Sequence, residues 1–358
     1  MSATIFNNAT LRLARDYFGL SQTAFGKKIS TKQSVISNIE NGERPLETEQ
    51  IEHLKDHFTF SFFKNDIILP SQQLFYRKLA STSKSLVSAF EARLTLISMT
   101  ITTLLDIIDI PENKIPKIDL EDHNFNYEYL ANEIRLKFGI LRGPIENIVG
   151  LLEKNGVIIH FFDFDFISSD NRNFDGVSTY VNGVPLILIN NKIPNSRKVF
   201  TIAHELAHLI FHFDQNNIIA ESRNKEKEAD SFAAAFLAPK IEVQSEFKRL
   251  NKEKLFSLKK VWKMSAAAIL YRTKDIGNIT QDWYNKCIFW LSPYRKLEPF
   301  EFEIENPSLL KKVIDLAQNE TDFSFLKQLG FKEIVVDELF STIIPKKTSI
   351  LRKLTIEL

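Results

Sequence analysis

The feature that most constrains this chain is the sequence His-Glu-Leu-Ala-His at residues 204–208. An α-helix turns once every 3.6 residues, so His204 and His208 would lie one turn apart on one helix face, where both imidazoles can reach the same zinc ion. Glu205 would lie beside them, placed to take a proton from a zinc-bound water molecule. The pattern therefore predicts a zinc site on a helix, with His204 and His208 as ligands and Glu205 as the catalytic base.

A third ligand is expected downstream, because catalytic zinc sites have three protein ligands and one open position. The segment 226–239 is the best source, since it reads as a helix ended by Pro239, and its alanines at 233–235 would let two helices approach closely. Glu226 and Asp230 are four residues apart and share a helix face. We expect Glu226 to be the third ligand and Asp230 to orient a ligand histidine through its other ring nitrogen.

His212 continues the row of histidines, four residues beyond His208. On a straight helix it lies about 12 Å from His204, so one ion cannot bind all three histidines. We therefore expect His212 to support the ligands or to pack, and not to bind the metal. The alternative for the whole set is a polar turn on an ordinary helix.

The composition limits which classes of protein this chain can belong to. A chain of 358 residues, 44% hydrophobic and 25% charged, is long enough for two or three globular domains. The net charge of +1 means that any DNA binding has to come from a local surface. The single cysteine, Cys287, excludes an internal disulfide and fits a reducing compartment. The first eight residues lack the pattern of a signal peptide, and the apolar stretch 94–110 is too short and polar to span a bilayer, so we expect a cytoplasmic protein.

Residues 1–62 predict an all-α bundle of short helices. A short turn separates the segment 22–28 from a helix at 32–41, which stops at Gly42. Two short helices around a tight turn are the helix-turn-helix geometry, whose second helix enters the major groove of DNA. Gln and Asn side chains can pair with adenine, and Lys and Arg can contact phosphates. The predicted DNA contacts are Lys27, Lys28, Lys32, Gln33, Ser34, Ser37, Asn38 and Arg44; the alternative is a helical bundle with solvated polar faces.

The same region resembles a known family. Leu-Ser-Gln-Thr-Ala-Phe-Gly at 20–26, Val-Ile-Ser-Asn-Ile-Glu-Asn-Gly at 35–42 and Pro45 are similar to the phage-repressor type, or Xre family, of helix-turn-helix proteins. The resemblance implies that Ser21 and Gln22 lie near the DNA backbone, and that the predicted contacts between 32 and 38 belong to the recognition helix. Because such domains usually bind paired half-sites as dimers, we expect double-stranded operator DNA and a second copy of the chain as partners.

A second resemblance covers about 110 residues. Leu-Ile-Leu-Ile-Asn at 186–190, the motif at 204–208 with Arg197 and Phe200 before it, and the segment 226–239 together resemble the ImmA/IrrE family of zinc metallopeptidases. The resemblance implies Zn²⁺ bound by His204, His208 and Glu226, with Glu205 catalytic. It also implies a narrow protein substrate, typically a repressor or similar regulator, cleaved in a stress or mobile-element response. Ala238 stands where the family often has methionine.

These patterns divide the chain into four parts. We expect the DNA-binding domain at 1–62, a helical connector at 63–130, a zincin-like metallopeptidase domain with a small sheet at 131–245, and a C-terminal α+β region at 246–358. The whole is therefore an α+β protein, mainly helical. The connector contains an amphipathic stretch, 83–110, which either packs within the chain or forms a dimer seam. Self-cleavage within 65–73 is a further hypothesis.

The metallopeptidase region predicts helices at 131–138 and 144–155, then strands at 157–162, 177–181 and 185–190. Asn182-Gly183 is a strong hairpin signal between the last two strands. The strand directly before the zinc-binding helix would offer an edge to which an extended peptide substrate can add. In the C-terminal region, 258–272 predicts a helix-turn-helix unit, which we expect to pack and not to touch DNA.

The favoured interpretation is a DNA-binding transcriptional regulator with a zinc-dependent endopeptidase domain. One rival is a transcription regulator that uses the metal domain structurally or as a sensor, without cleaving anything. Another is an antitoxin-like protein that binds a partner protein through its C-terminal region. The intact Glu205 argues against the first rival, because structural zinc has no use for a general base.

Overall fold

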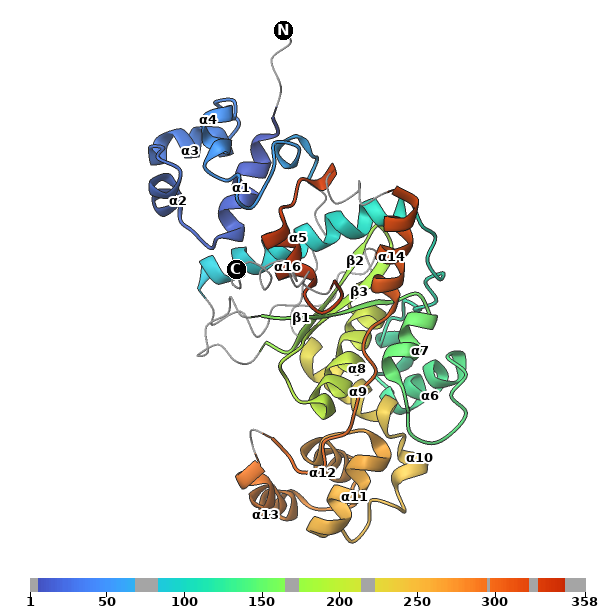
Figure 1. Ribbon diagram of the computed structural model, residues 1–358. Coiled ribbons are helices and arrows are strands. Elements are labelled where there is room, and N and C mark those ends of the chain that lie inside the picture. Colours follow the sequence, from blue (N-terminus) through green and yellow to red (C-terminus); the bar gives the residue numbers. More distant parts are fainter. Residues whose placement is uncertain are drawn as a thin grey trace, which may run out of the picture.

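A three-stranded β-sheet crosses the middle of the part of the chain that the structure describes (Figure 1). The structure is a computed structural model and describes residues 6–67, 83–164, 174–213, 223–294, 297–321 and 328–344. The strands are β1 (Ile158–Phe162), β2 (Gly176–Val181) and β3 (Val184–Asn190). Their order is β1-β3-β2, with β1 parallel and β2 antiparallel to β3. The fold class is confirmed: the protein is mainly helical with a small sheet.

The hairpin between β2 and β3 is confirmed. Val181 pairs with Val184, and the two residues between them, Asn182 and Gly183, have φ angles of 47° and 81°. Positive φ at both positions is what a two-residue type I′ turn requires, and Asn followed by Gly tolerates it best. The expectation that β3 offers an open edge to a substrate is wrong, because β3 pairs with β1 on its other side. Among the described strands β2 and β1 are the outer ones.

Alternation of side chains along the strands places two hydrophobic cores on the two faces of the sheet. One face carries Ile159, Phe161, Ile187 and Ile189, which belong to a core with the helices that follow β3 and precede β1. These helices are α6 (Tyr127–Lys137), α7 (Ile148–Lys154), α8 (Asn195–Phe211), α9 (Lys225–Leu237), α10 (Lys240–Val243), α11 (Lys252–Trp262), α12 (Ala266–Asp275) and α13 (Gln281–Leu291). The helices predicted at 131–138 and 144–155 correspond to α6 and α7, with shifted ends.

The other face of the sheet carries Ile158, Phe162, Leu186 and Leu188, which join a second core with the two ends of the chain. The N-terminal helices are α1 (Asn8–Tyr17), α2 (Gln22–Lys28), α3 (Gln33–Glu40) and α4 (Thr48–Glu52); the others on this face are α5 (Lys84–Leu105), α14 (Leu309–Thr321) and α16 (Glu333–Phe340).

Helix α5 is the main part of the predicted connector. It packs within the chain, against α1, β2 and α14, and is buried along most of its length. Even polar side chains such as Ser98 and Thr100 are inaccessible to solvent. Arg93 donates to the carbonyl oxygen of Tyr17 at 2.8 Å, which ties α5 to the end of α1. The predicted domain boundaries at 62, 130 and 245 stay predictions. On this face of the sheet, residues from both sides of the boundaries at 62 and 130 pack in one core.

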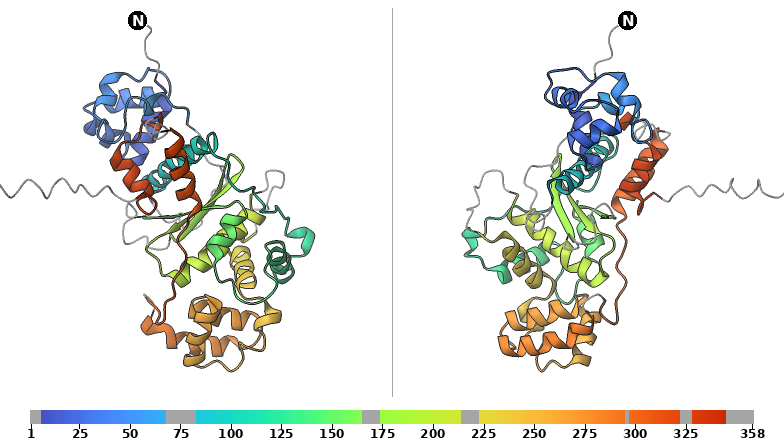
Figure 2. Two further views of the ribbon diagram at one scale, coloured as in Figure 1. Left: turned by 45° about the vertical axis from the view of Figure 1, so that its right-hand side comes forward. Right: turned by 90° about the vertical axis from the view of Figure 1, so that its left-hand side faces the viewer.

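The C-terminal region folds as helices in its described residues. The helix-turn-helix unit at 258–272 is present as α11 and α12, with Lys263 in a left-handed conformation between them. The chain then runs back along the molecule and places α14 and α16 beside the sheet and the N-terminal helices (Figures 1 and 2). Strands were also expected here, yet the β-type pairing of the described C-terminal residues is one bridge, between Phe331 and Phe58.

No described helix is long and apolar enough to cross a membrane. Of the segment 65–73, for which self-cleavage was a hypothesis, residues 68–73 lie outside the described part of the chain.

Candidate metal centre and nucleic-acid interface

Helix α8 presents the two histidines of the motif on one face. His204 and His208 are both buried, and their Nε2 atoms lie 3.0 Å apart. The one-turn spacing produces this convergence, since residues four apart on a helix are neighbours. The two imidazoles therefore point their Nε2 atoms at one location beside α8.

Glu226 of α9 completes this cluster. Its two carboxylate oxygens each lie 3.6 Å from one of the histidine Nε2 atoms. One donor atom from each of the three residues can be chosen so that all lie within 4.8 Å of one another. The alanines at 233–235 are buried where α9 packs on α8, and their small size permits the close approach. Two imidazoles and a carboxylate are the donor set of a catalytic zinc site, so these residues fit the metal.

A second set of contacts orients the two histidines. The Nδ1 atom of His204 donates to Oδ1 of Asp230 at 2.8 Å, and the Nδ1 atom of His208 lies 2.8 Å from the Nδ1 atom of His212. His212 in turn donates from Nε2 to Glu228 at 2.9 Å. With His212 donating there, its Nδ1 accepts the proton of His208. Both ligand candidates thus carry their ring proton on Nδ1 and direct a lone pair of Nε2 toward Glu226, as metal ligation requires.

This chain of contacts ends in a partly buried ion pair. Arg223 donates from Nε and Nη2 to the two oxygens of Glu228, at 3.0 and 2.8 Å. Burial alone would raise the pKa of Glu228, but the hydrogen bonds from His212 and Arg223 outweigh it and lower that pKa to about 2. Glu228 is therefore ionised over the physiological range and holds the His212 ring in place.

The electrostatics of the centre favour a cation. Burial lowers the pKa of His204, yet the hydrogen bond to Asp230 and the charges of Glu205 and Glu226 outweigh burial, and the net pKa is raised. The same carboxylates that stabilise a proton on His204 would stabilise a bound metal ion.

Glu205 lies on α8 next to the histidines and is buried. The hydroxyl of Ser178 donates to Oε2 of Glu205 at 2.7 Å. Ser178 belongs to β2, an outer strand of the sheet, so the candidate base lies where α8 meets that strand. Sequence reasoning missed Ser178 and Arg223. Ser178 stands out in its strand only as a polar residue on a buried face, and Arg223 carries no signal in its local sequence.

The predicted DNA-binding residues gather on α2, α3 and the turns beside them. Lys27, Lys28, Lys32 and Gln33 are exposed, and so are Ser21, Ser34, Asn38 and Arg44; Gln22 and Ser37 are half-buried. Ile36 and Ile39 on the opposite side of α3 are fully buried, which fixes the exposed face of the helix. Ser21 caps α2 by accepting from the backbone N–H of Ala24 at 3.2 Å.

A short polar network holds part of this face. Glu40 accepts from Arg15 at 2.6 Å and from Gln22 at 2.9 Å, and Gln22 accepts from Gln33 at 2.8 Å. Gln33 at the start of α3 is therefore positioned from α2. Helices α2 and α3, which carry most of the predicted DNA contacts, lie on the opposite side of the sheet from α8 and α9 (Figure 1).

Family models match two parts of the chain. Residues 11–52 match a model described as helix-turn-helix. Residues 152–274 match the model of peptidase family M78, described as an IrrE N-terminal-like domain. The chain thus carries a helix-turn-helix domain followed by an IrrE-like domain, and both resemblances drawn from the sequence are confirmed. A comparison with curated proteins found no match.

The two matches locate the candidate sites. The helix-turn-helix match contains α2 and α3, and the IrrE-like match contains the metal cluster, Glu205 and Ser178. The IrrE-like match also extends through α11 to within α12, so the helix pair that follows the metal centre lies inside it, whereas α13 lies outside. The matches support a DNA-binding regulator with a peptidase-like domain.

Proposed function

We propose that this protein is a cytoplasmic transcriptional regulator that binds operator DNA and cleaves a regulatory protein with a zinc-dependent endopeptidase domain. The observation that carries the proposal is the convergence of His204, His208 and Glu226, with Glu205 held beside them by Ser178. Three protein ligands leave a fourth zinc position open, and a buried carboxylate next to an open position is the arrangement of a hydrolytic site and not of a structural one.

In the proposed mechanism each side chain has a separate task. When bound, zinc would act as a Lewis acid that polarises a peptide carbonyl and lowers the pKa of water. Glu205 takes a proton from the attacking water on its carboxylate and delivers it to the nitrogen of the departing amine. Ser178 orients the Glu205 carboxylate through its hydrogen bond to Oε2. Asp230 and His212 keep the two histidine rings in the orientation that ligation needs.

The substrate class follows from the combination of domains. The resemblance to ImmA/IrrE peptidases supports a repressor or other regulatory protein, cleaved in a stress or mobile-element response. An extended segment of that protein would lie along β2, because β2 is an outer strand and carries Ser178 beside Glu205. The helix-turn-helix domain would bind a double-stranded operator through α3, with a second copy of the chain on the paired half-site.

The rival interpretations, a regulator or antitoxin that uses the metal domain without cleavage, do not account for the buried Glu205. The Glu205 carboxylate is removed from water beside the two histidines and accepts a hydrogen bond from Ser178. This is the pattern of a group kept for chemistry.

The test is a comparison of new protein amino termini in host cells that express the wild type or Glu205→Gln, with and without DNA damage. Fragments that appear only with the wild type are expected, and they would identify the substrate. An identical set of termini in both strains, with zinc bound to both proteins, would contradict the endopeptidase and leave a DNA-binding regulator.

A further inference from the structure

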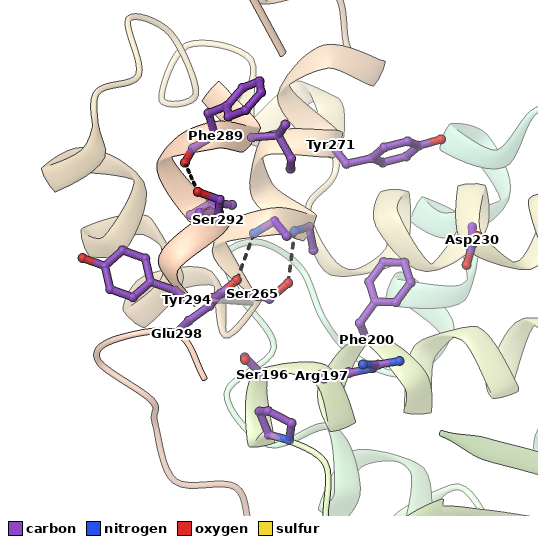
Figure 3. A pocket seen from close by; sticks show the side chains of 15 residues that line it. Ser196, Arg197, Phe200, Asp230, Ser265, Tyr271, Phe289, Ser292, Tyr294 and Glu298 are labelled. Atoms are coloured by element: carbon purple, nitrogen blue, oxygen red, sulfur yellow. Dashed lines mark hydrogen bonds between the residues drawn. The ribbon is translucent and has the colours of Figure 1, made fainter. Parts of the chain in front are cut away.

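A cavity of about 560 Å³ lies beside the metal centre, between α8, α12 and α13 (Figure 3). Asp230 lines the cavity and also holds the Nδ1 atom of His204 at 2.8 Å, so the cavity begins one side chain away from a metal-ligand candidate. Phe200 lines it as well, one turn before His204 on the same face of α8. Four residues of helix correspond to about 6 Å, which is the length of about two residues of extended chain.

The lining of the cavity is mostly apolar. Its apolar side chains come from three helices, with Phe200 on α8, Ala267, Ala268 and Tyr271 on α12, and Ile288 and Phe289 on α13. Phe289 is 74% exposed, an unusual position for so large an apolar side chain. In Figure 3 Phe200 extends from α8 into the space below α12 and α13. The volume is within the range of cavities that bind ligands.

The charged groups at the cavity already have partners within the chain. Arg197 donates to Asp175 at 2.6 Å, and Asp230 accepts from His204. Glu298 accepts from the backbone N–H of Ala266 at 2.7 Å and from Lys259 at 3.0 Å. An apolar occupant would leave these contacts intact, whereas a charged occupant would have to compete with them and lose its hydration.

The cavity is lined by residues inside the IrrE-like match and by residues beyond its end. Its α8, α9 and α12 residues lie within residues 152–274, which match the IrrE-like model. Its α13 residues and Glu298 lie beyond that match. One wall of the cavity is therefore formed by a segment that lies outside the family-model match.

We propose that this cavity binds a large apolar side chain of the protein substrate, within about two residues of the cleaved bond, and that α13 determines this specificity. The inference rests on the proposed endopeptidase function. The occupant is a peptide side chain because the cavity begins at Asp230, which contacts His204, and at Phe200, one helical turn before His204, and because its charged groups already have partners.

The first experiment is digestion of a proteome-derived peptide library by the zinc-loaded full-length protein, with mass spectrometry of the products. Leu, Ile, Met or Phe is expected at one fixed position within about two residues of the cleaved bonds. Cleavage without an apolar preference at any such position would overturn the cavity's role and leave the endopeptidase standing.

Two variants change the cavity without touching the metal ligands. Ala268→Phe fills it, and Phe289→Ser removes an apolar rim; Leu141→Ser, 78% exposed on a distant loop, is the matched control. For a cleaved peptide with Leu at the preferred position, each cavity variant should lower kcat/KM about tenfold or more, mainly through KM. A peptide with Gly there should change less than about twofold, and Leu141→Ser should behave as the wild type. Equal effects on both peptides would contradict the proposal.

Binding separates the inference from the proposed function. If no peptide is cleaved, the endopeptidase fails, and the same library is passed over immobilised Glu205→Gln protein. Retention of peptides with large apolar residues, lost with Ala268→Phe and Phe289→Ser, would support the cavity without catalysis. Absence of retention would overturn both ideas. A dimer that Phe289→Ser dissociates while cleavage stays unchanged would assign the cavity to a second copy of the chain and overturn the proposal.

Discussion

The metal centre and the DNA-binding face hold their side chains in opposite ways. At the metal centre, His204, His208 and Glu205 are buried, and each has a hydrogen-bond partner that fixes its orientation. On the DNA-binding face most predicted contacts are exposed, and the network through Gln22 fixes Gln33. Chemistry requires groups held in position before the substrate arrives, whereas phosphate contacts need mainly charge at the surface. We therefore expect substitutions at the metal centre to cause large losses of activity, and substitutions on the predicted DNA-binding face to cause smaller losses of DNA affinity.

The largest effect is expected from Glu205→Gln. Loss of a general base lowers the rate of a proton-transfer step by about 10²–10⁴-fold. Operator affinity and zinc content should stay those of the wild type, because the amide keeps the shape and can still accept from Ser178. The measurement is kcat/KM for a peptide from the library, alongside zinc analysis. Loss of zinc together with activity would mean that Glu205 acts on the metal site itself.

The next largest effect is expected on the stability of the folded protein, and it depends on His160 of β1. Burial lowers the pKa of His160 to about 4, although its Nε2 atom donates to the carbonyl oxygen of Leu339 at 2.8 Å. Between about pH 6.5 and 4 the unfolded chain binds a proton that the folded chain does not, so stability falls as the pH falls through this window. One pKa unit corresponds to about 1.4 kcal/mol, and the full loss over this window is at most about 3.5 kcal/mol.

Urea denaturation at pH 7.5 and pH 5 measures this loss. His160→Gln serves as the control because its amide can still donate to Leu339 and does not titrate. The wild type should lose more stability than the variant over this interval. Equal losses would show that His160 is protonated in the folded protein.

His212→Gln tests whether the metal centre depends on its supporting contacts. Partners of metal ligands typically contribute about 10–100-fold to metal affinity. We expect a zinc-affinity loss of that size, measured by competition with a chelator, with little change in operator binding. Glu226→Ala, which removes a ligand candidate, should cost more. An unchanged zinc affinity in His212→Gln would show that the metal centre does not depend on its supporting contacts, and would contradict the difference proposed between the two regions.

Gln33→Ala tests the one predicted DNA contact that the Gln22 network positions. A side chain that reads a base contributes about 1–3 kcal/mol of discrimination, so operator binding should weaken while binding to unrelated DNA stays the same. The measurement is affinity for both DNAs at one salt concentration. Equal weakening on both DNAs would make Gln33 a backbone contact.

The smallest effect is expected from Lys27→Ala. Lys27 is exposed at the end of α2, where a lysine can contact a phosphate. Its removal should weaken binding to all DNA sequences alike and reduce the slope of log affinity against log salt by about one. A loss confined to the operator would overturn this assignment.

Much of the candidate site was predictable from the sequence, because its signals are local. His204 and His208 lie on one helix, and the partners Glu226 and Asp230 lie on one face of the next. Small residues let two helices pack closely, so the sequence also predicted that Glu226 and Asp230 approach the histidines of α8. The contacts of Ser178 and Arg223 were not predictable, because neither residue differs from an ordinary surface or strand residue until the fold brings it beside Glu205 or Glu228.

The sheet shows the same limit. The Asn182-Gly183 turn encodes the pairing of β2 with β3, because neighbouring strands joined by two residues can pair in few ways. The position of β1 on the other side of β3 depends on a parallel connection through residues far apart in the chain. That pairing turned the expected edge strand into the central one.

Spacing along the chain by itself determined the helix that carries the candidate ligands His204 and His208, the hairpin, and the two short helices of the helix-turn-helix domain. Only the tertiary structure decided that α5 is buried within the chain, that α14 and α16 return to the N-terminal helices, and that α13 closes a cavity beside His204. The physical reason is that helix and turn preferences act over a few residues, whereas packing depends on which apolar faces meet. Which apolar faces pack together depends on how much apolar surface the whole chain can bury.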